Sequence, residues 1–211
     1  MNFLKHLPKA TKVFNSWAKE GRDQGMEKGH SHSVNEMLEF AINERAVKEK
    51  EFSFLDLGCG NGWVVHKMIK ERFCYRAVGI DGAKNMIAKA KLNGGNGEFI
   101  LADLNSYKSS EEFDLIHSME VLYYLDNPEE SIKRFCDEWL KPGGRFISGI
   151  DHYYENKESH SWEKKVGTAM LMLSEDDWFK IFKKSCLKNI RMWRANKSKN
   201  WAGTLVLTGE K

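Results

Sequence analysis

An apolar run that ends in an acidic residue and passes straight into three alternating glycines constrains this chain more than any other feature. The segment reads Phe54-Leu55-Asp56-Leu57-Gly58-Cys59-Gly60-Asn61-Gly62. Glycines in such a turn allow close approach of a ligand, and the helix that follows presents free N–H groups and a positive dipole end. The pattern predicts a strand, a tight turn and a helix that together bind a nucleoside-like ligand.

Composition narrows the class of protein. The chain has 211 residues, which suits one domain with its own core, and its 33 basic and 30 acidic residues give a net charge of only +3. This balance does not indicate nucleic-acid binding. The four cysteines form no Cys-x-x-Cys pair, and no segment has the length and apolarity of a signal peptide or membrane span. We expect a cytoplasmic protein with reduced thiols and no metal site.

Short apolar runs alternate with longer helical patterns, which is typical of repeated βαβ units around a parallel sheet. Seven strands are predicted, over 52–57, 75–80, 98–101, 113–117, 145–150, 189–194 and 204–207. Only a short polar stretch separates the last two, so they should form a hairpin that makes the final strand antiparallel. The fold class is α/β, with a seven-stranded, mostly parallel sheet and helices on both faces.

Helix starts are marked by capping residues. Asn127 precedes a proline and two glutamates, and Ser174 precedes three acidic residues and an apolar stripe. The sequence Ser33-Val34-Asn35-Glu36 has the same capping-box form, so a helix is expected to start at Ser33. The polar, glycine-spaced segment before it, 17–32, is expected to be a mobile lid. Within one domain we distinguish a lid and helix (1–50), a cofactor-binding core (51–150), and a substrate loop with the C-terminal hairpin (151–211).

The second strand ends in Asp81, about 20 residues beyond the glycines, where a carboxylate can accept hydrogen bonds from both ribose hydroxyls. A dinucleotide fingerprint would need glycine at position 63, which is Trp63 here, and no Gly-Lys-Ser or Gly-Lys-Thr follows. The ligand therefore contains a nucleoside and lacks phosphates.

Five ordered motifs resemble those of class I S-adenosylmethionine-dependent methyltransferases. They are Leu55 to Gly62, Asp81, Ala102-Asp103-Leu104, Phe113-Asp114-Leu115-Ile116 and Leu140-Lys141-Pro142-Gly143-Gly144. The resemblance covers roughly residues 52–150. It implies a Rossmann-like sheet and S-adenosylmethionine as the cofactor.

Carried over residue by residue, the resemblance implies that Asp56 lies near the ammonium group of the cofactor and that Asp81 holds its ribose. Asp103 would accept from the adenine amino group, and Leu104 would offer its backbone N–H to the ring. The implied cofactor contacts are Asp56, Gly58, Cys59, Gly60, Asp81, Gly82, Met86, Asp103, Leu104, Ser118, Met119, Glu120 and Tyr123. Cys59 is expected to be a buried thiol and not a nucleophile.

Residues after the fourth and fifth strands and in the lid are the candidates for handling the methyl acceptor. His152 is the candidate general base, and a purely structural role for it is an equal alternative; His117 is a weaker candidate because strand alternation could point it away. The expected acceptor contacts are Trp17, Arg22, Met26, His30, Tyr124, Asp151, Tyr153 and Trp162. No metal is expected at His30 and His32, because no carboxylate or cysteine follows at ligand spacing.

A small-molecule acceptor is the preferred interpretation, because the additions to the core look like a lid over an enclosed pocket. An RNA or protein acceptor is the alternative, favoured by basic residues over 180–199 together with Trp193 and Trp201. Ser118-Met119-Glu120-Val121 lacks the motif typical of enzymes that methylate base amines, so we do not expect nucleic acid as a partner. A noncatalytic cofactor-binding subunit is the remaining alternative. The sequence does not indicate an oligomeric state.

Overall fold

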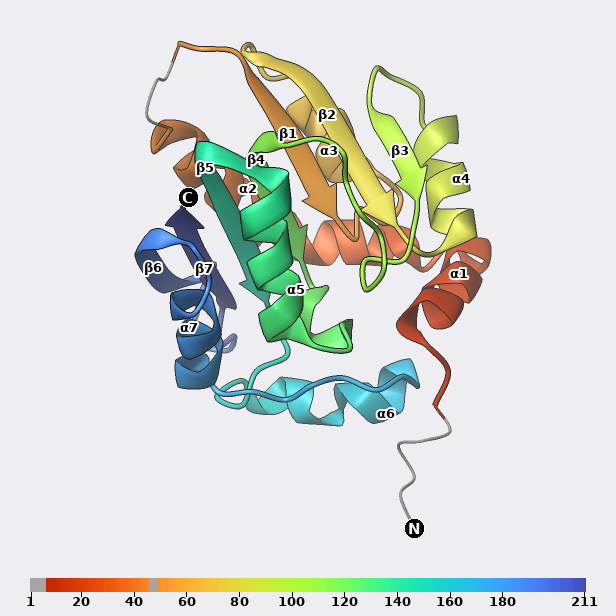
Figure 1. Ribbon diagram of the computed structural model, residues 1–211. Coiled ribbons are helices and arrows are strands. Elements are labelled where there is room, and N and C mark those ends of the chain that lie inside the picture. The colour runs from red at the N-terminus through yellow and green to blue at the C-terminus, as the bar shows by residue number, and fades with distance from the viewer. Residues whose placement is uncertain (1–6, 46–48) are drawn as a thin grey trace.

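A seven-stranded sheet forms the centre of the protein in the computed structural model, which describes residues 7–45 and 49–211 (Figure 1). The strand order is β3-β2-β1-β4-β5-β7-β6. The strands are β1 Phe52–Leu57, β2 Cys74–Asp81, β3 Glu98–Leu101, β4 Phe113–Met119, β5 Leu140–Ile150, β6 Lys188–Ala195 and β7 Thr204–Glu210. All seven predicted strands are confirmed.

The sheet is parallel from β3 to β5, and β7 runs antiparallel to both of its neighbours. The predicted C-terminal hairpin is therefore confirmed. The largest difference in a boundary is at β5, which starts at Leu140 and includes the segment 140–144 before the predicted strand. Leu140 pairs with Phe113 and Arg145 with Leu115, so this segment bulges out of the ladder, and Gly143 takes a φ of 75° there.

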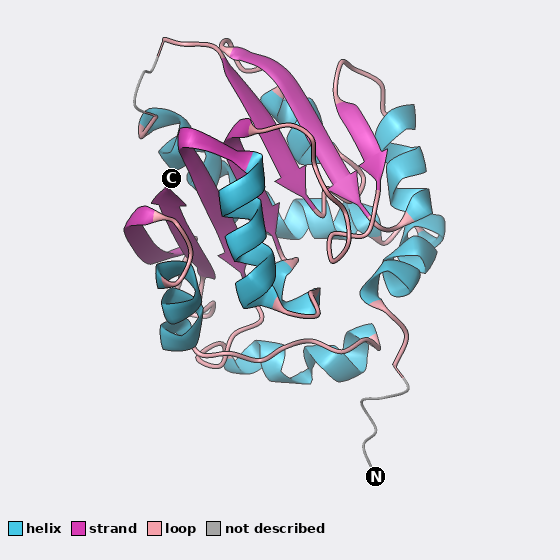
Figure 2. Ribbon diagram, in the orientation of Figure 1, coloured by secondary structure: helices cyan, strands magenta, loops and turns pink. Residues whose placement is uncertain are grey.

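Helices cover both faces of the sheet (Figure 2). Side chains of β1 alternate between two cores: Phe54 packs with α2 and α3 on one face, and Leu55 packs with α5 and α7 on the other. The α-helices are α1 Ala10–Glu20, α2 Asp23–Asn43, α3 Trp63–Met68, α4 Lys84–Leu92, α5 Pro128–Arg134, α6 Trp162–Val166 and α7 Glu175–Lys183. Shorter helical turns span Leu122–Tyr124, Phe135–Trp139 and Lys157–Ser161. No helix in the described ranges is both long and apolar enough to cross a membrane.

Two of the three predicted helix caps are confirmed. Asn127 accepts from the backbone N–H of Glu130 at 3.2 Å, and Ser174 accepts from that of Asp177 at 3.1 Å. The cap predicted at Ser33 is wrong, because α2 already begins at Asp23 and Ser33 is buried in its middle. Its hydroxyl instead accepts from Thr204 Oγ1 at 2.7 Å, so tertiary packing overrides the local capping signal.

The segment predicted as a lid, 17–32, forms the end of α1 and the first half of α2, and these helices lie against the carboxyl end of the sheet (Figure 1). Specific hydrogen bonds hold α1 there. Asn15 Oδ1 accepts from the backbone N–H of Asn85 at 2.8 Å, and the Asn15 carbonyl accepts from Asn85 Nδ2 at 3.0 Å. Thr168 Oγ1 donates to the carbonyl of Pro8 at 2.7 Å. In this conformation the N-terminal helices close over the strand ends.

Candidate functional site

A cavity of about 250 Å³ lies where the parallel strands end. Its walls include the residues that follow the first four strands, which are Gly58, Gly60, Asp81, Gly82, Asp103, Leu104, Met119 and Glu120. A smaller cavity of about 60 Å³ adjoins it, and the two share Met26, Gly58, Gly60, Met86, Met119 and Glu120 in their walls. Residues far apart in the sequence meet here because parallel strands end at one edge of the sheet.

The glycine turn has a shape that only glycine adopts easily. Gly58 has a φ of 69°, and a Cβ built on it would lie 2.3 Å from Val121 Cγ2. Gly60 has a φ of 54°, yet a Cβ there would meet no other atom within 4 Å. Gly58 therefore fits the packing of the turn, and Gly60 leaves open space on the wall of both cavities that a ligand can occupy.

Asp81 is held by the backbone beside this turn. Its Oδ2 accepts from the N–H of Gly60 at 2.9 Å, and its Oδ1 accepts from the N–H of Ala83 at 2.7 Å. Burial raises the pKa of Asp81 to about 6, and these two hydrogen bonds limit the rise. Each carboxylate oxygen keeps a second lone pair, so the group can still accept hydrogen bonds from a vicinal diol in the cavity.

The loop after β3 is fixed by an arginine that the sequence did not single out. Arg134 on α5 donates to the carbonyls of Leu104 and Asn105. Asp103 Oδ1 accepts from the backbone N–H and the side-chain amide of Asn105, both at 3.0 Å, and Lys9 Nζ lies 3.9 Å from Asp103 Oδ2. The carboxylate and the Leu104 backbone are therefore positioned to meet a heterocycle at this end of the cavity.

The smaller cavity contains a buried pair, Asp56 and His117. The sequence analysis expected Asp56 in the site and treated His117 only as a weaker candidate. His117 Nδ1 lies 2.7 Å from Asp56 Oδ1, and His117 Nε2 has no hydrogen-bond partner within residues 7–45 and 49–211. His117 does not point away from the site but lines this cavity. Asp23 closes the cavity from α2, where it accepts from Asn61 Nδ2 at 3.2 Å and Lys89 Nζ at 2.6 Å.

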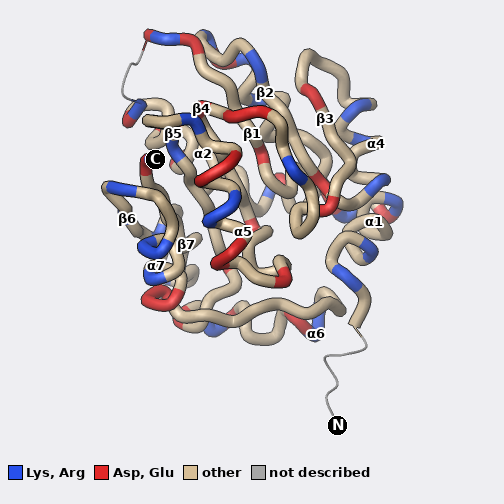
Figure 3. The backbone as a smooth tube through the Cα atoms, viewed as in Figure 1, with Lys and Arg blue, Asp and Glu red and all other residues tan. Residues whose placement is uncertain are grey.

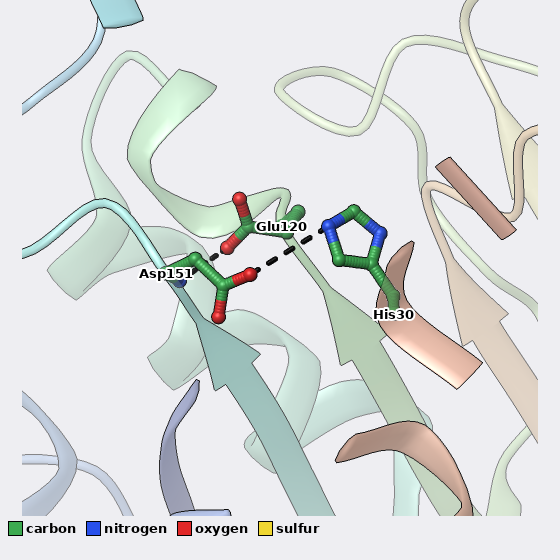
Figure 4. Close-up of side chains that lie close together, drawn as sticks. All are labelled: His30, Glu120 and Asp151. Carbon is green, nitrogen blue, oxygen red and sulfur yellow. Dashed lines mark hydrogen bonds and ion pairs between the residues drawn. The ribbon is translucent and has the colours of Figure 1, made fainter. Parts of the chain in front are cut away.

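Three titratable side chains lie close together where α2 meets the ends of β4 and β5, as Figure 4 shows. Glu120 follows β4 with a φ of 60°, Asp151 follows β5, and His30 reaches them from α2. The backbone N–H of Asp151 donates to Glu120 Oε1, and Tyr123 donates its hydroxyl to Glu120 Oε2 at 2.6 Å. Burial, and then the charge of Asp151, raises the pKa of Glu120 well above its usual range.

The structure brings together most of the predicted cofactor contacts. Those that line either cavity are Asp56, Gly58, Cys59, Gly60, Asp81, Gly82, Met86, Asp103, Leu104, Met119 and Glu120. Ser118 and Tyr123 are buried outside both walls, and Tyr123 reaches the site only through its hydrogen bond to Glu120. Burial raises the pKa of the Cys59 thiol well above its usual range, which agrees with an unreactive sulfur.

The predicted acceptor contacts divide into two groups. Met26, His30 and Tyr124 line the cavities. The others do not: Trp17 stacks under the Arg22 guanidinium at 3.8 Å, Tyr153 is buried with its hydroxyl on the Gly203 carbonyl, and Trp162 packs near the His152 ring. Asp151 is also outside the walls and acts on the site only through its neighbours Glu120 and His30.

His152, the predicted general base, lies behind the cavity and not in its wall. It is 1% exposed, its Nδ1 lies 3.1 Å from the Ser159 carbonyl, and its ring centroid is 5.3 Å from that of Tyr123. Burial lowers its pKa below the usual range. The geometry favours the structural alternative for His152, and a catalytic role for it stays an unsupported prediction.

Several wall residues were missed in the sequence. Thr11 and Phe14 come from α1, and Thr168 and Ala169 come from the segment after α6. None of them belongs to a motif, so only the three-dimensional arrangement identifies them. Gly82 is the one sequence position that hints at this contact. A Cβ at Gly82 would lie 2.4 Å from Thr11 Cγ2, so glycine at this position allows α1 to approach the strand end closely.

The comparisons with known proteins agree on one family. The profile of a family described as "Methyltransferase domain" matches residues 48–203. Malonyl-acyl-carrier-protein O-methyltransferase of Halalkalibacterium halodurans is 28% identical over 61% of this chain and 50% of its own length. Ubiquinone biosynthesis O-methyltransferase of Hydrogenovibrio crunogenus is 28% identical over 71% of this chain and 63% of its own length. The chain thus spans less than two thirds of the length of each of these relatives.

Solved structures share the fold. A chain in a complex between the Haloferax volcanii Trm112 methyltransferase activator and a methyltransferase superposes with a TM-score of 0.78 at 24% identity, covering 93% of this chain and 96% of that one. The N-methyltransferase NodS of Bradyrhizobium japonicum, in complex with S-adenosyl-L-homocysteine, gives a TM-score of 0.63 at 19% identity and covers 84% of each chain. At these identities the likeness concerns the fold alone.

Proposed function

This chain belongs to the class I S-adenosylmethionine-dependent methyltransferases, and we propose that it transfers a methyl group from S-adenosylmethionine to a small-molecule acceptor. The observation that carries the proposal is the cavity at the strand ends, whose walls hold the glycine turn, Asp81 and Asp103 together. Most of the contacts that the resemblance implies for the cofactor thus lie on one continuous surface.

The wall residues suit the cofactor. Gly60 leaves open space beside backbone N–H groups, Asp81 can accept from both ribose hydroxyls, and Asp103 can accept from an amino group of adenine. Asp56 lies in the smaller cavity, where a carboxylate would attract the ammonium group of the methionine part. S-adenosylmethionine supplies a methyl group already activated on a sulfonium, so the protein chiefly has to orient the acceptor and exclude water.

The cover over the cavity supports a small acceptor. Helix α1, the first half of α2 and the segment at Thr168 enclose the strand ends and are hydrogen-bonded to the core or to each other. A chain as large as RNA or a folded protein would have to displace this cover. Both relatives named above are O-methyltransferases and the structural neighbour NodS is an N-methyltransferase, so we leave the attacking atom open.

Several of the basic C-terminal residues are paired with acidic side chains. Lys184 pairs with Glu129, Arg191 with Glu44, and Arg194 with Glu175. Figure 3 shows acidic and basic positions interleaved around α5, α7 and β6. These pairs weaken the case for an RNA acceptor at this part of the chain.

Glu120 is the side chain best placed to act on the acceptor. It lines both cavities, whereas His152 lines neither of them. We therefore assign the main role toward the acceptor to Glu120 in preference to His152, which is buried next to Tyr123.

Two isosteric changes test these assignments. The assay measures transfer of labelled methyl groups to a pool of small metabolites, together with calorimetric titration of S-adenosylmethionine. Glu120→Gln should lower turnover by roughly a hundredfold while the chain still binds the cofactor, and His152→Gln should leave turnover within about threefold of wild type. The opposite ranking of the two variants would return this role to His152, and absence of cofactor binding by the unaltered chain would overturn the proposed function.

A further inference from the structure

Three metal-ligating atoms converge at the wall of the smaller cavity. They belong to His30, Glu120 and Asp151, and all lie within 4.8 Å of one another. Figure 4 shows the imidazole of His30 directed toward the two carboxylates from the opposite side of the site. Each side chain comes from a different element, so the arrangement is made by the fold and not by sequence spacing.

The distances suit a shared ion better than a direct hydrogen bond. His30 Nε2 lies 3.6 Å from Asp151 Oδ2, which is longer than a normal N–H···O bond. Nitrogen and oxygen ligands lie at about 2.0 to 2.2 Å from zinc, so two neighbouring ligands of one ion are separated by roughly 3.0 to 3.5 Å. Shifts of a few tenths of an ångström to about 1 Å would therefore bring all three atoms into one coordination shell.

The charge and burial of the two carboxylates also favour a bound cation. Asp151 is 3% exposed, and no hydrogen bond of normal geometry reaches its Oδ1 in the part of the chain that the structure describes. A hydrogen-bond contact from the Thr204 hydroxyl, which also donates to Ser33 Oγ at 2.7 Å, lowers the pKa of Asp151. Neither Glu120 nor Asp151 forms an ion pair with a lysine or arginine among the described residues. Buried carboxylates are normally paired with a cation or bound to a metal, and His30 is the only basic side chain paired with these two among the described residues.

The donor set indicates the kind of ion. Burial lowers the pKa of His30, so the imidazole is neutral and has a lone pair for a metal. One imidazole and two carboxylates suit zinc or manganese better than magnesium or calcium, which prefer oxygen ligands alone. Three protein ligands leave further coordination positions open, and His30 and Glu120 both line the cavity.

We propose that His30, Glu120 and Asp151 bind one divalent transition-metal ion, of the zinc or manganese kind, whose open positions take an oxygen atom of the methyl acceptor. The second half of this statement rests on the proposed function, whereas the metal site does not. The sequence led us to expect no metal at His30, because no carboxylate follows it at ligand spacing. The fold supplies the missing carboxylates from the ends of β4 and β5.

The test is a calorimetric titration of the metal-free, untagged full chain with Zn²⁺ and, separately, with Mn²⁺, in the absence of cofactor. We expect one ion per chain for at least one of them. His30→Ala and Asp151→Asn should each weaken binding at least tenfold. His32→Ala is the matched control, because His32 is exposed two residues further along α2, and it should bind the ion as the wild type does. If His30→Ala does not fold, His30→Gln replaces it, with thermal melting as the check.

Titration of S-adenosylmethionine with the same samples separates the two proposals. Cofactor binding without binding of either ion overturns the metal site and leaves the proposed function intact. Equal loss of metal binding in His32→Ala and His30→Ala, or unchanged binding in His30→Ala, also overturns the site, since the ion would then be held elsewhere. Metal binding without cofactor binding would keep the metal site and overturn the proposed function.

Discussion

The affinity for S-adenosylmethionine should rise with pH between 5 and 7 because of Asp81. The carboxylate is buried, and its pKa of about 6 means that it carries a proton at pH 5 in the free protein. Ribose hydroxyls donate hydrogen bonds to an ionised carboxylate, so the cofactor binds the deprotonated form better and binding releases a proton.

The magnitude follows from this pKa. With a value of about 6, the ionised fraction of Asp81 increases from about one tenth at pH 5 to about nine tenths at pH 7, which corresponds to a roughly tenfold gain in affinity, or about 1.4 kcal/mol. Stability of the free chain changes in the opposite direction. Because the folded pKa lies above the unfolded value of 3.8, the folded state binds more protons in this window. This group therefore costs up to about 3 kcal/mol of unfolding free energy as pH rises from about 4 to about 6.

Isothermal titration at pH 5, 6 and 7, at constant ionic strength, measures the effect, and Asp81→Asn is the control. The asparagine cannot accept from both Gly60 N–H and Ala83 N–H, because its amide nitrogen is a donor, and it has no charge for the ribose. We expect it to bind the cofactor about 1 to 3 kcal/mol more weakly at pH 7 and to lose the pH dependence. A flat wild-type profile, or an unchanged slope in Asp81→Asn, would refute this reasoning and point to another titrating group.

Two further predictions concern the turn and the N-terminal cover. Gly58→Ala should lower the unfolding free energy by about 2 to 4 kcal/mol, because the backbone is left-handed there and the new Cβ would clash with Val121. Gly60→Ala has only the backbone strain and should lower the unfolding free energy by about 1 to 2 kcal/mol. Equal losses of the two variants in urea unfolding would contradict the packing role of Gly58. Asn15→Ala removes the acceptor for the Asn85 N–H and should speed cofactor dissociation roughly fivefold with little change in melting temperature; an unchanged rate in stopped-flow measurements would mean that α1 does not hold the cofactor in place.

The centre of the sheet could be predicted because its inner strands are short apolar runs buried on both faces. All six residues of β1 are buried, and a run of this kind between turn residues has few other uses. Local capping signals were less reliable. Asn127 and Ser174 cap helices, whereas Ser33 lies inside a longer helix, where its hydroxyl bonds to Thr204 from the other end of the chain. A contact between residues 171 positions apart in the sequence cannot be predicted from a local pattern.

The residues of the site also differ in how far the sequence predicted them. Asp81 was expected in the site from its position at a strand end, and Asp103 from the resemblance to the family. The parallel strands bring both to one edge of the sheet, where they line the cavity. Contributions from outside the sheet were not predictable in this way. The position of His152 behind Tyr123, and the meeting of His30 with Glu120 and Asp151, depend on how α2 and the loop after β5 pack.

The most direct test of the central claim is to incubate the full chain with S-adenosylmethionine labelled on its methyl group, and with separate pools of small metabolites, RNA and protein. We predict that label enters a compound in the small-molecule pool and that Asp81→Asn greatly reduces the transfer at a cofactor concentration near the wild-type dissociation constant. Label that appears only in RNA or protein, or in no pool although the cofactor binds, would contradict the proposed small-molecule methyl transfer.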